Sequence, residues 1–171
     1  MPYAVTTVTR QPHLGRTLAR LHPGHYRRDM RISDVVKRKG ATVITVRSDA
    51  SVTELLALLD EHGIGAVVVS DDGQSLAGIV SERDIVRHLH KDGAKVLDQP
   101  VSSIMTSEVQ TCAPEDQLVE LEHTMTELRI RHVPVVVDGR LTGIVSIGDV
   151  VKHRITDLQA ERDQLSAYIQ Q

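Results

Sequence analysis

Two serine–aspartate pairs stand at matching places in the sequence and carry its most informative chemistry. Residues 78–84 read GIVSERD and residues 143–149 read GIVSIGD, so that Ser81 and Asp84 return as Ser146 and Asp149. An aspartate can accept hydrogen bonds from two vicinal ribose hydroxyls, and free N–H groups at a helix start favour a phosphate. The same spacing also makes a capping box, which stabilises a helix by about 1 kcal/mol without any ligand. Both interpretations are open, and one residue can serve both.

The repeat is longer than these two motifs. Residues 45–55 align with residues 111–121, and residues 63–69 align with residues 129–135, both at an offset of 66. The offset falls to 65 at the second motif, because one residue is missing from the later turn. Two repeats therefore cover about residues 31–90 and 100–155. A unit of about 60 residues buries too little apolar surface to be more than marginally stable alone, so we expect the repeats to share an interface.

The periodicity of apolar residues gives both repeats the order β-α-β-β-α. In the first repeat we expect strands at residues 43–46, 66–69 and 76–80, a helix over 52–61, and a second helix that Ser81 caps. In the second we expect a strand at 109–112, a helix over 117–128, strands at 133–137 and 141–145, and a helix from Ile147. Asp138-Gly139 is a strong hairpin signal between the last two strands. The predicted class is α+β, with two tandem repeats packed as one pseudo-twofold unit.

Composition excludes several kinds of function. The 171 residues include no Phe, no Trp and three Tyr, so the core must be aliphatic and base-stacking surfaces for nucleic acid are not expected. The net charge of −3 also argues against nucleic acid, and no apolar run is long enough for a membrane span. The lone Cys112 cannot form an internal disulfide, which fits a cytoplasmic protein, and its apolar neighbours predict a buried strand position.

Four segments make up the expected layout, namely residues 1–30, 31–92, 100–153 and 154–171. The first is an arm or an upstream start, since residues 1–28 hold five Arg and no acid. The last is an amphipathic helix that either folds back on its own chain or pairs with another subunit; its apolar positions are Ile155, Leu158, Leu165 and Ile169. His88 and His90 would diverge on a helix, so no metal site is expected.

Residues 132–139 (HVPVVVDG) and residues 143–149 (GIVSIGD) resemble the cystathionine-β-synthase (CBS) domain. The tandem looks like a CBS pair, or Bateman module, of the small stand-alone bacterial kind. This resemblance implies a non-catalytic adenine-nucleotide sensor that binds AMP, ADP, ATP or NAD between the repeats. It also implies a disc-like homodimer and a further protein target that the sequence does not name.

The resemblance assigns roles to particular residues. It puts Asp84 and Asp149 on ribose, and Ser81 and Ser146 near phosphate. The basic pair Arg131-His132 would bind phosphate, whereas the aligned Gly65 and Ala66 cannot do so through side chains. Arg83 either reaches phosphate or lies on an exposed helix face, so the two sites are chemically unequal. The implied adenine walls are Thr42, Ile44, Ile64 and Ala66 in one half, and Val109, Thr111, Ile130 and Pro134 in the other.

Two other classes of function are alternatives to a nucleotide sensor. In a ligand-free dimerisation or interaction module the serine–aspartate pairs would only cap helices. An enzyme is poorly supported, because no nucleophile arrangement, phosphate-binding loop or metal motif is identifiable.

Overall fold

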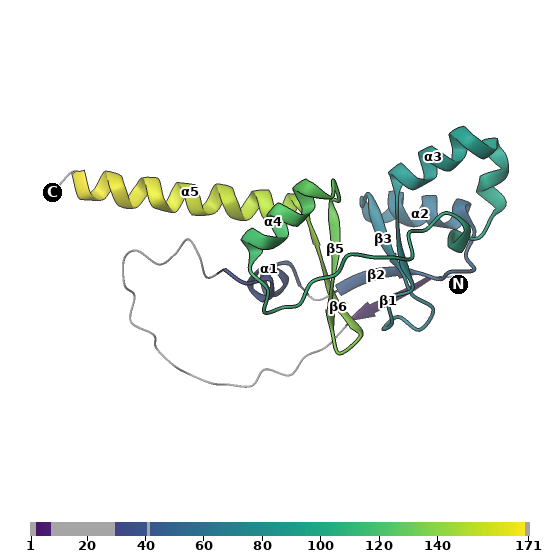
Figure 1. The fold of residues 1–171 in the computed structure, drawn as a ribbon, viewed down its shortest axis with the longest axis horizontal. Coiled ribbons are helices and arrows are strands. Elements are labelled where there is room, and N and C mark those ends of the chain that lie inside the picture. The colour runs from purple at the N-terminus through teal and green to yellow at the C-terminus, as the bar shows by residue number, and fades with distance from the viewer. Residues whose placement is uncertain (1–2, 8–29, 41, 170–171) are drawn as a thin grey trace.

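The computed structural model describes residues 3–7, 30–40 and 42–169. It consists of two related halves beside each other, from one of which a long helix projects (Figure 1). This α+β arrangement agrees with the sequence prediction. The elements are β1 (Tyr3–Thr7), α1 (Ile32–Lys39), β2 (Thr42–Val46), α2 (Val52–His62), β3 (Ala66–Val69), β4 (Gly78–Ser81), α3 (Glu82–Asp92), the short 3-10 helices η1 (Gly93–Asp98) and η2 (Val101–Ser103), α4 (Leu118–Glu127), β5 (His132–Val137), β6 (Arg140–Ser146) and α5 (Ile147–Ile169).

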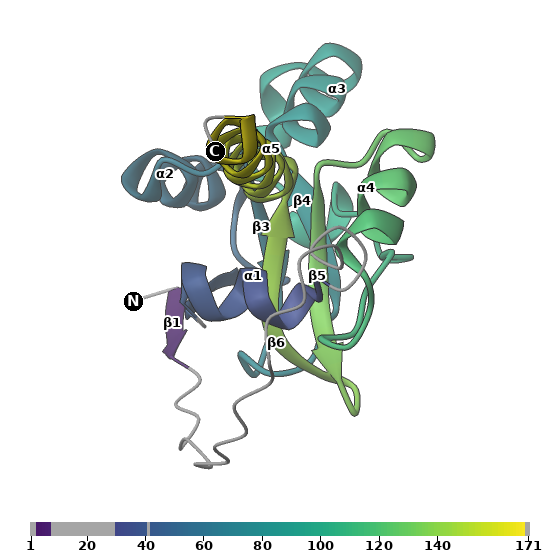
Figure 2. The same ribbon diagram turned by 90° about the vertical axis from the view of Figure 1, so that its left-hand side faces the viewer.

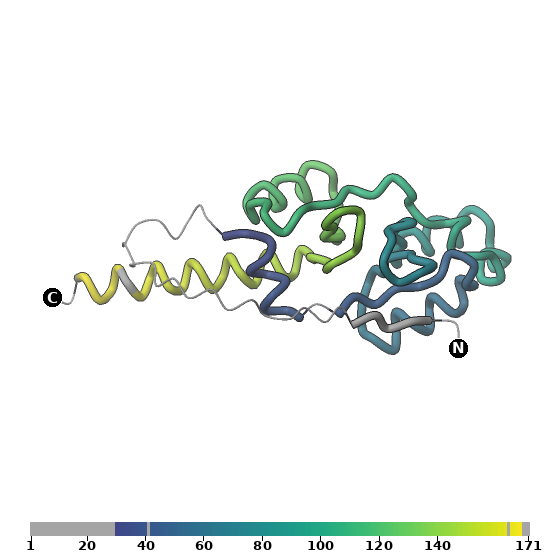
Figure 3. Tube along the Cα trace, turned by 90° about the horizontal axis from the view of Figure 1, so that it is seen from below, coloured from purple at the N-terminus to yellow at the C-terminus, as the bar shows by residue number. Residues whose placement is uncertain are grey.

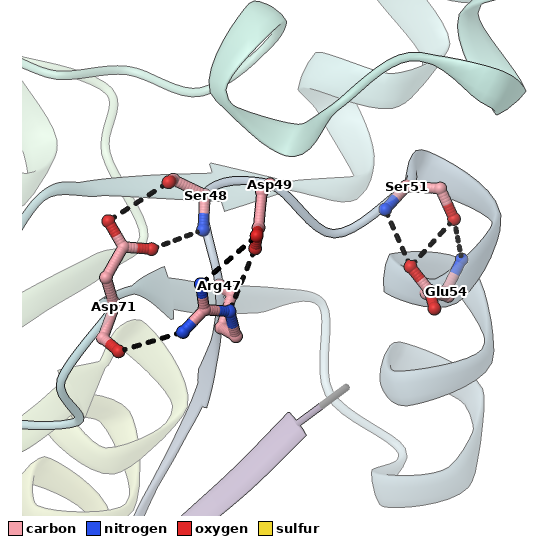
Figure 4. A network of polar contacts seen from close by, with 6 residues as sticks. All are labelled: Arg47, Ser48, Asp49, Ser51, Glu54 and Asp71. Carbon is pink, nitrogen blue, oxygen red and sulfur yellow. Dashed lines mark hydrogen bonds and ion pairs between the residues drawn. The ribbon is translucent and has the colours of Figure 1, made fainter. Parts of the chain in front are cut away.

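The first half is built on a four-stranded sheet in the order β1-β2-β3-β4. Strands β2 and β3 are parallel, and all four residues of β3, one alanine and three valines, are buried. A capping box at Ser51 and Glu54 starts α2, with the backbone N–H of Ser51 donating to Glu54 Oε2 at 2.8 Å (Figure 4). Helix α2 ends at Gly63, whose φ of 60° is left-handed and suits glycine. The helix lies where the sequence predicts one, over residues 52–61, whereas the Ser51–Glu54 cap was not among the predicted signals.

The expected strand at residues 109–112 is wrong, because only Cys112 pairs with β5. The N–H of Cys112 donates to the carbonyl of Pro134 at 3.1 Å, and the N–H of Val136 donates to the carbonyl of Cys112 at 2.9 Å. Continuing this parallel ladder in either direction would need a donor from Pro134 or from Pro114, and proline has no N–H. The pairing is therefore confined to one bridge. Cys112 is nevertheless buried, and burial, with a smaller effect from Asp116, raises the pKa of its thiol to about 12.

Helix α1 precedes the first half in sequence but packs against the second. Ile32 and Val35 of α1 belong to the same buried cluster as Val133 and Val145. The backbone N–H of Ile32 also donates to the carbonyl of Asp116 at 3.0 Å. Figures 2 and 3 show α1 crossing β6 and lying beside the start of α5. Chain order alone would place this helix with the first repeat.

The segment that leads into the second half, η1 and η2, packs in turn against the first half. Val96 of η1 and Val101 of η2 are fully buried in the core of the first half, and the N–H of Val101 donates to the carbonyl of Ala50 at 2.8 Å. A smaller cluster of Val43, Val68 and Leu141 joins the two sheets directly. The shared interface that repeat size demands is thus confirmed, and it includes an exchange of leading segments.

Both ends of the chain add features to the predicted layout. Residues 3–7, which the sequence places in an arm, form strand β1 and pair antiparallel with β2; residues 8–29 lie outside the described residues. At the other end, α5 runs unbroken from Ile147 to Ile169, so no helix boundary falls at residue 154. Val150 and His153, which belong to the first turns of α5, are buried, whereas Leu158 and Leu165 further along the helix are more than half exposed.

Candidate functional site

Both serine–aspartate pairs form the helix-capping arrangement. In the first, the N–H of Ser81 donates to Asp84 Oδ2 at 2.9 Å and the hydroxyl donates to the same oxygen at 2.6 Å. In the second, the N–H and hydroxyl of Ser146 each lie 2.8 Å from Asp149 Oδ2. The pair Ser51–Glu54 makes the same contacts at α2, so capping explains part of what these residues do.

Each aspartate keeps capacity beyond capping. All these bonds end on Oδ2, and in the described part of the chain no hydrogen bond ends on Oδ1 of Asp84 or Asp149. A carboxylate oxygen has two lone pairs, so Oδ1 can accept from hydroxyl groups while Oδ2 holds the helix start. The capping geometry is therefore compatible with the ribose role.

The helix starts are anchored in equivalent ways in the two halves. The N–H of Glu82 donates to the carbonyl of Gly65 at 3.0 Å, and the N–H of Ile147 donates to the carbonyl of Arg131 at 2.8 Å. These bonds place each motif beside the entry to β3 or β5, and the predicted phosphate-binding pair Arg131-His132 lies at the entry to β5. In the second half Ser146, Asp149 and the Arg131-His132 pair are thereby brought together.

His132 lies within reach of several charged groups. Burial lowers the pKa of His132, and the charges of Lys39 and Arg131 lower it further, while Asp149 and Glu82 oppose the shift. Charges from α1, from α3 and from the start of α5 therefore all act on one imidazole. With a lowered pKa, His132 is neutral near pH 7 and offers one N–H donor and one acceptor.

Lys39 contacts the predicted site residue Asp149, and the sequence analysis did not predict this contact. Its ammonium group lies 2.8 Å from Asp149 Oδ2 and 3.3 Å from the carbonyl of Ile144. Burial raises the pKa of Asp149, but hydrogen bonds from Lys39 and Ser146 outweigh this and lower it below its usual value. No local signal could have found this pair, because it depends on α1 packing against the other repeat.

Glu82 is a second residue that the sequence analysis overlooked. A Cβ added to Gly65 would lie 3.2 Å from Glu82 Oε2, so this carboxylate packs against the glycine that aligns with Arg131. An acid thus stands in the first half where the second has a base. This supports the predicted chemical inequality of the two positions.

The remaining predicted residues are spread over several environments. Arg83 is exposed on the first turn of α3, and Thr42 is exposed at the start of β2. Ala66 and Pro134 are buried within β3 and β5. Half-buried positions are Ile44, Ile64, Gly65, Val109, Thr111 and Ile130.

A pocket of about 190 Å³ lies between α1 and α5. Of the residues predicted from the sequence only Asp149 lines it, and the adenine-wall candidates do not. Its walls are Val35, Arg38, Lys39, Asp149, Lys152, His153 and Thr156. The pocket therefore borders the predicted site on its α1 side.

The two repeats match a known protein family. The family model described as "CBS domain" matches residues 32–91 and residues 101–155. The chain is a CBS-domain protein. Its two CBS repeats correspond to the two halves of the fold, apart from the exchange of α1 and of the η1–η2 segment.

Similar proteins include plant and bacterial CBS-domain chains. A mitochondrial CBS domain-containing protein of Arabidopsis thaliana, CBSX3, is 38% identical over an alignment of length 147, and the match covers 81% of this chain and 71% of that protein. The crystal structure of a CBS-domain containing protein from Agrobacterium tumefaciens is 46% identical with a TM-score of 0.71, and the match covers 73% of this chain and 99% of the other.

A further solved structure contains ligands. The CBS domain pair of protein MJ0100, in complex with 5′-methylthioadenosine and S-adenosyl-L-methionine, is 26% identical to this CBS pair with a TM-score of 0.66. The match covers 75% of this chain and 98% of that one. Among the described residues of this CBS pair, no helix is long and apolar enough to cross a membrane, and no group of three metal-ligating side chains occurs.

Proposed function

We propose that this CBS pair is a non-catalytic regulatory module that binds an adenine nucleotide, AMP, ADP, ATP or NAD, between its repeats. The observation that carries the proposal is the grouping of Asp149 with Arg131, His132 and Lys39. A carboxylate with a free oxygen suits a ribose, while Arg and Lys side chains suit phosphates.

The similarity to MJ0100 supports the adenosine part of this proposal. That protein's CBS pair is seen with two adenosine-containing ligands, neither of which is a nucleotide polyphosphate. The polar groups around Asp149 favour a ligand with phosphate groups in the present chain. The unequal residues at the two motifs favour one strong site, at Asp149, over two equal ones.

The test is isothermal titration calorimetry on protein stripped of bound nucleotide. AMP, ADP, ATP and NAD are titrated into the wild type, into Asp149→Asn and into Asp84→Asn. We expect at least one ligand to bind, Asp149→Asn to weaken it at least tenfold, and Asp84→Asn to have a smaller effect.

A matched control separates ligand binding from capping. Glu54→Gln changes the capping box of α2, which lies away from the predicted site, so it should lower the free energy of unfolding by about 1 kcal/mol without changing affinity. The capping-only alternative, a ligand-free assembly module, predicts that all three variants behave alike and that no adenosine-containing ligand binds. That outcome would refute the nucleotide proposal.

We also propose that the protein assembles as a homodimer through α5. Ile155, Leu158 and Leu165 are 51%, 54% and 59% exposed on a helix that projects from the body (Figure 1). Together with Arg162 they follow a spacing of three, four and three residues (155, 158, 162 and 165), which is the pattern of a two-helix coiled-coil interface in which Arg162 takes one apolar position. A second copy of the same helix would cover this stripe.

A further inference from the structure

The α1–α5 pocket has the character of an anion site. Of the residues that line it, three carry permanent positive charges, Arg38, Lys39 and Lys152, and one is acidic, Asp149. The acid is already compensated, because Lys39 lies 2.8 Å from its Oδ2. The side chains of Arg38 and Lys152 form no hydrogen bond or ion pair with any residue that the structure describes, although the carbonyl of Lys152 accepts from the Thr156 hydroxyl at 3.0 Å. Two cations therefore face the pocket without a partner.

His153 provides an independent sign of a missing ligand. The side chain lines the pocket and the residue is only 7% exposed. Its Nδ1 is buried and has no hydrogen-bond partner among the described residues. Leaving such a group unsatisfied costs about 1–3 kcal/mol, so a polar group at this place would be stabilised.

The size of the pocket restricts what it can hold. At about 190 Å³ it is smaller than the roughly 300–1,000 Å³ of sites that enclose a drug-sized molecule. It has room for a phosphoryl group but not for a whole nucleotide.

We infer that the α1–α5 pocket binds a phosphoryl group through Arg38, Lys152 and His153. The group belongs either to a nucleotide whose ribose lies on the other side of Asp149 or to free inorganic phosphate. Binding of a nucleotide's phosphoryl group rests on the proposed function, whereas binding of free inorganic phosphate does not.

Calorimetry with a graded set of ligands tests this inference. Adenosine, AMP, ATP and inorganic phosphate are titrated separately into the wild type and into Arg38→Ala/Lys152→Ala. Both side chains are exposed, so the double variant should fold normally. Lys37→Ala/Lys91→Ala removes the same charge from exposed positions outside the pocket and serves as the matched control.

If the phosphoryl group in the pocket belongs to a nucleotide, the wild type and the control should bind AMP at least tenfold more tightly than adenosine. The pocket variant should reduce this preference at least threefold, with Lys39 and Arg131 keeping the remainder, and should leave adenosine affinity unchanged. If the ligand of the pocket is free inorganic phosphate, phosphate alone should bind to the wild type and the control, and at least tenfold more weakly to the pocket variant. In either case the Nδ1 resonance of His153, assigned with His153→Gln, should shift when the ligand is added.

Two outcomes distinguish the inference from the proposed function. If adenosine and AMP bind equally, phosphate does not bind, and the pocket variant matches the control, the inference is wrong while the nucleotide site stands. If no adenosine compound binds but phosphate binds and requires Arg38 and Lys152, the pocket stands and the proposed function fails.

Discussion

The ammonium group of Lys39 lies 2.8 Å from Oδ2 of Asp149, although the two residues are 110 positions apart in the chain. This contact joins the carboxyl end of α1 to the amino end of α5. It also ties the helix that was exchanged between repeats to the carboxylate proposed to bind ribose. Under the proposed function, ligand binding at Asp149 would be coupled to the packing of α1 through this ion pair.

Replacing Lys39 with Met should make stability less dependent on pH. Lys39 helps to lower the pKa of Asp149 in the folded state, so the pair stabilises the fold above the unfolded pKa of about 4 and loses this contribution as pH falls through the lower folded pKa. Because the two side chains are 40% and 21% exposed, the contribution at pH 7 is only about 0.5 kcal/mol.

Urea unfolding at pH 7 and at pH 3 measures this effect. The free energy difference between wild type and Lys39→Met should shrink at the lower pH. Lys37→Met, on an exposed position of the same helix, is the control and should show no such change. An equal difference at both pH values would show that the ion pair does not set the pKa of Asp149.

Replacing Gly78 with Ala should destabilise the fold by about 1–3 kcal/mol. The new Cβ would lie 2.7 Å from Met105 Sδ and 2.9 Å from the carbonyl oxygen of Thr106. That carbonyl is held by the N–H of Ile79 at 3.0 Å, so the backbone cannot easily move away.

Gly148→Ala is the matched comparison, since its Cβ would approach only Ser146 Oγ, at 3.6 Å. Alanine is the better helix former, so this variant should be neutral or more stable by up to about 1 kcal/mol. Thermal and chemical unfolding of both variants check the pair. Equal stability of the two would contradict the close packing at Gly78.

Arg129→Gly should stabilise the protein by roughly 0.5–1 kcal/mol. Arg129 has a φ of 54°, a left-handed conformation that costs energy for any residue with a Cβ. The aligned residue in the first repeat is Gly63, with a φ of 60°. The reciprocal change Gly63→Ala should cost about 1 kcal/mol, and a loss of stability in both variants would exclude backbone strain as the cause.

Leu158→Glu/Leu165→Glu should weaken self-association without reducing the stability of the two halves. Both leucines are more than half exposed, so they contribute little to the core of a single chain. Sedimentation equilibrium should give a dimer for the wild type and a monomer for this variant. Ala160→Glu/Ala167→Glu adds the same charge on the opposite side of α5 and should remain dimeric; an unchanged mass in the leucine variant would rule out the α5 seam.

Local sequence patterns predicted most of the elements and their limits. The buried run of β3, the hairpin at Asp138-Gly139 and the cap at Ser81 each depend on residues close together in the chain. The strand at residues 109–112 failed because its pairing depends on which β5 residue lies opposite, and that residue's neighbour is Pro134. Alternation within a strand carries no information about the partner's missing donor.

The sequence alone determined that this protein has two homologous halves, each with an aspartate at a helix start. Repetition of motifs, turns and apolar spacing is local information, and chain order preserves it. Only the tertiary structure decided that α1 crosses to the second half, so that Lys39 reaches Asp149 and a basic pocket forms with His153. Helix α1 could bury Ile32 and Val35 against either repeat by hydrophobicity, and the choice depends on the packing of distant residues.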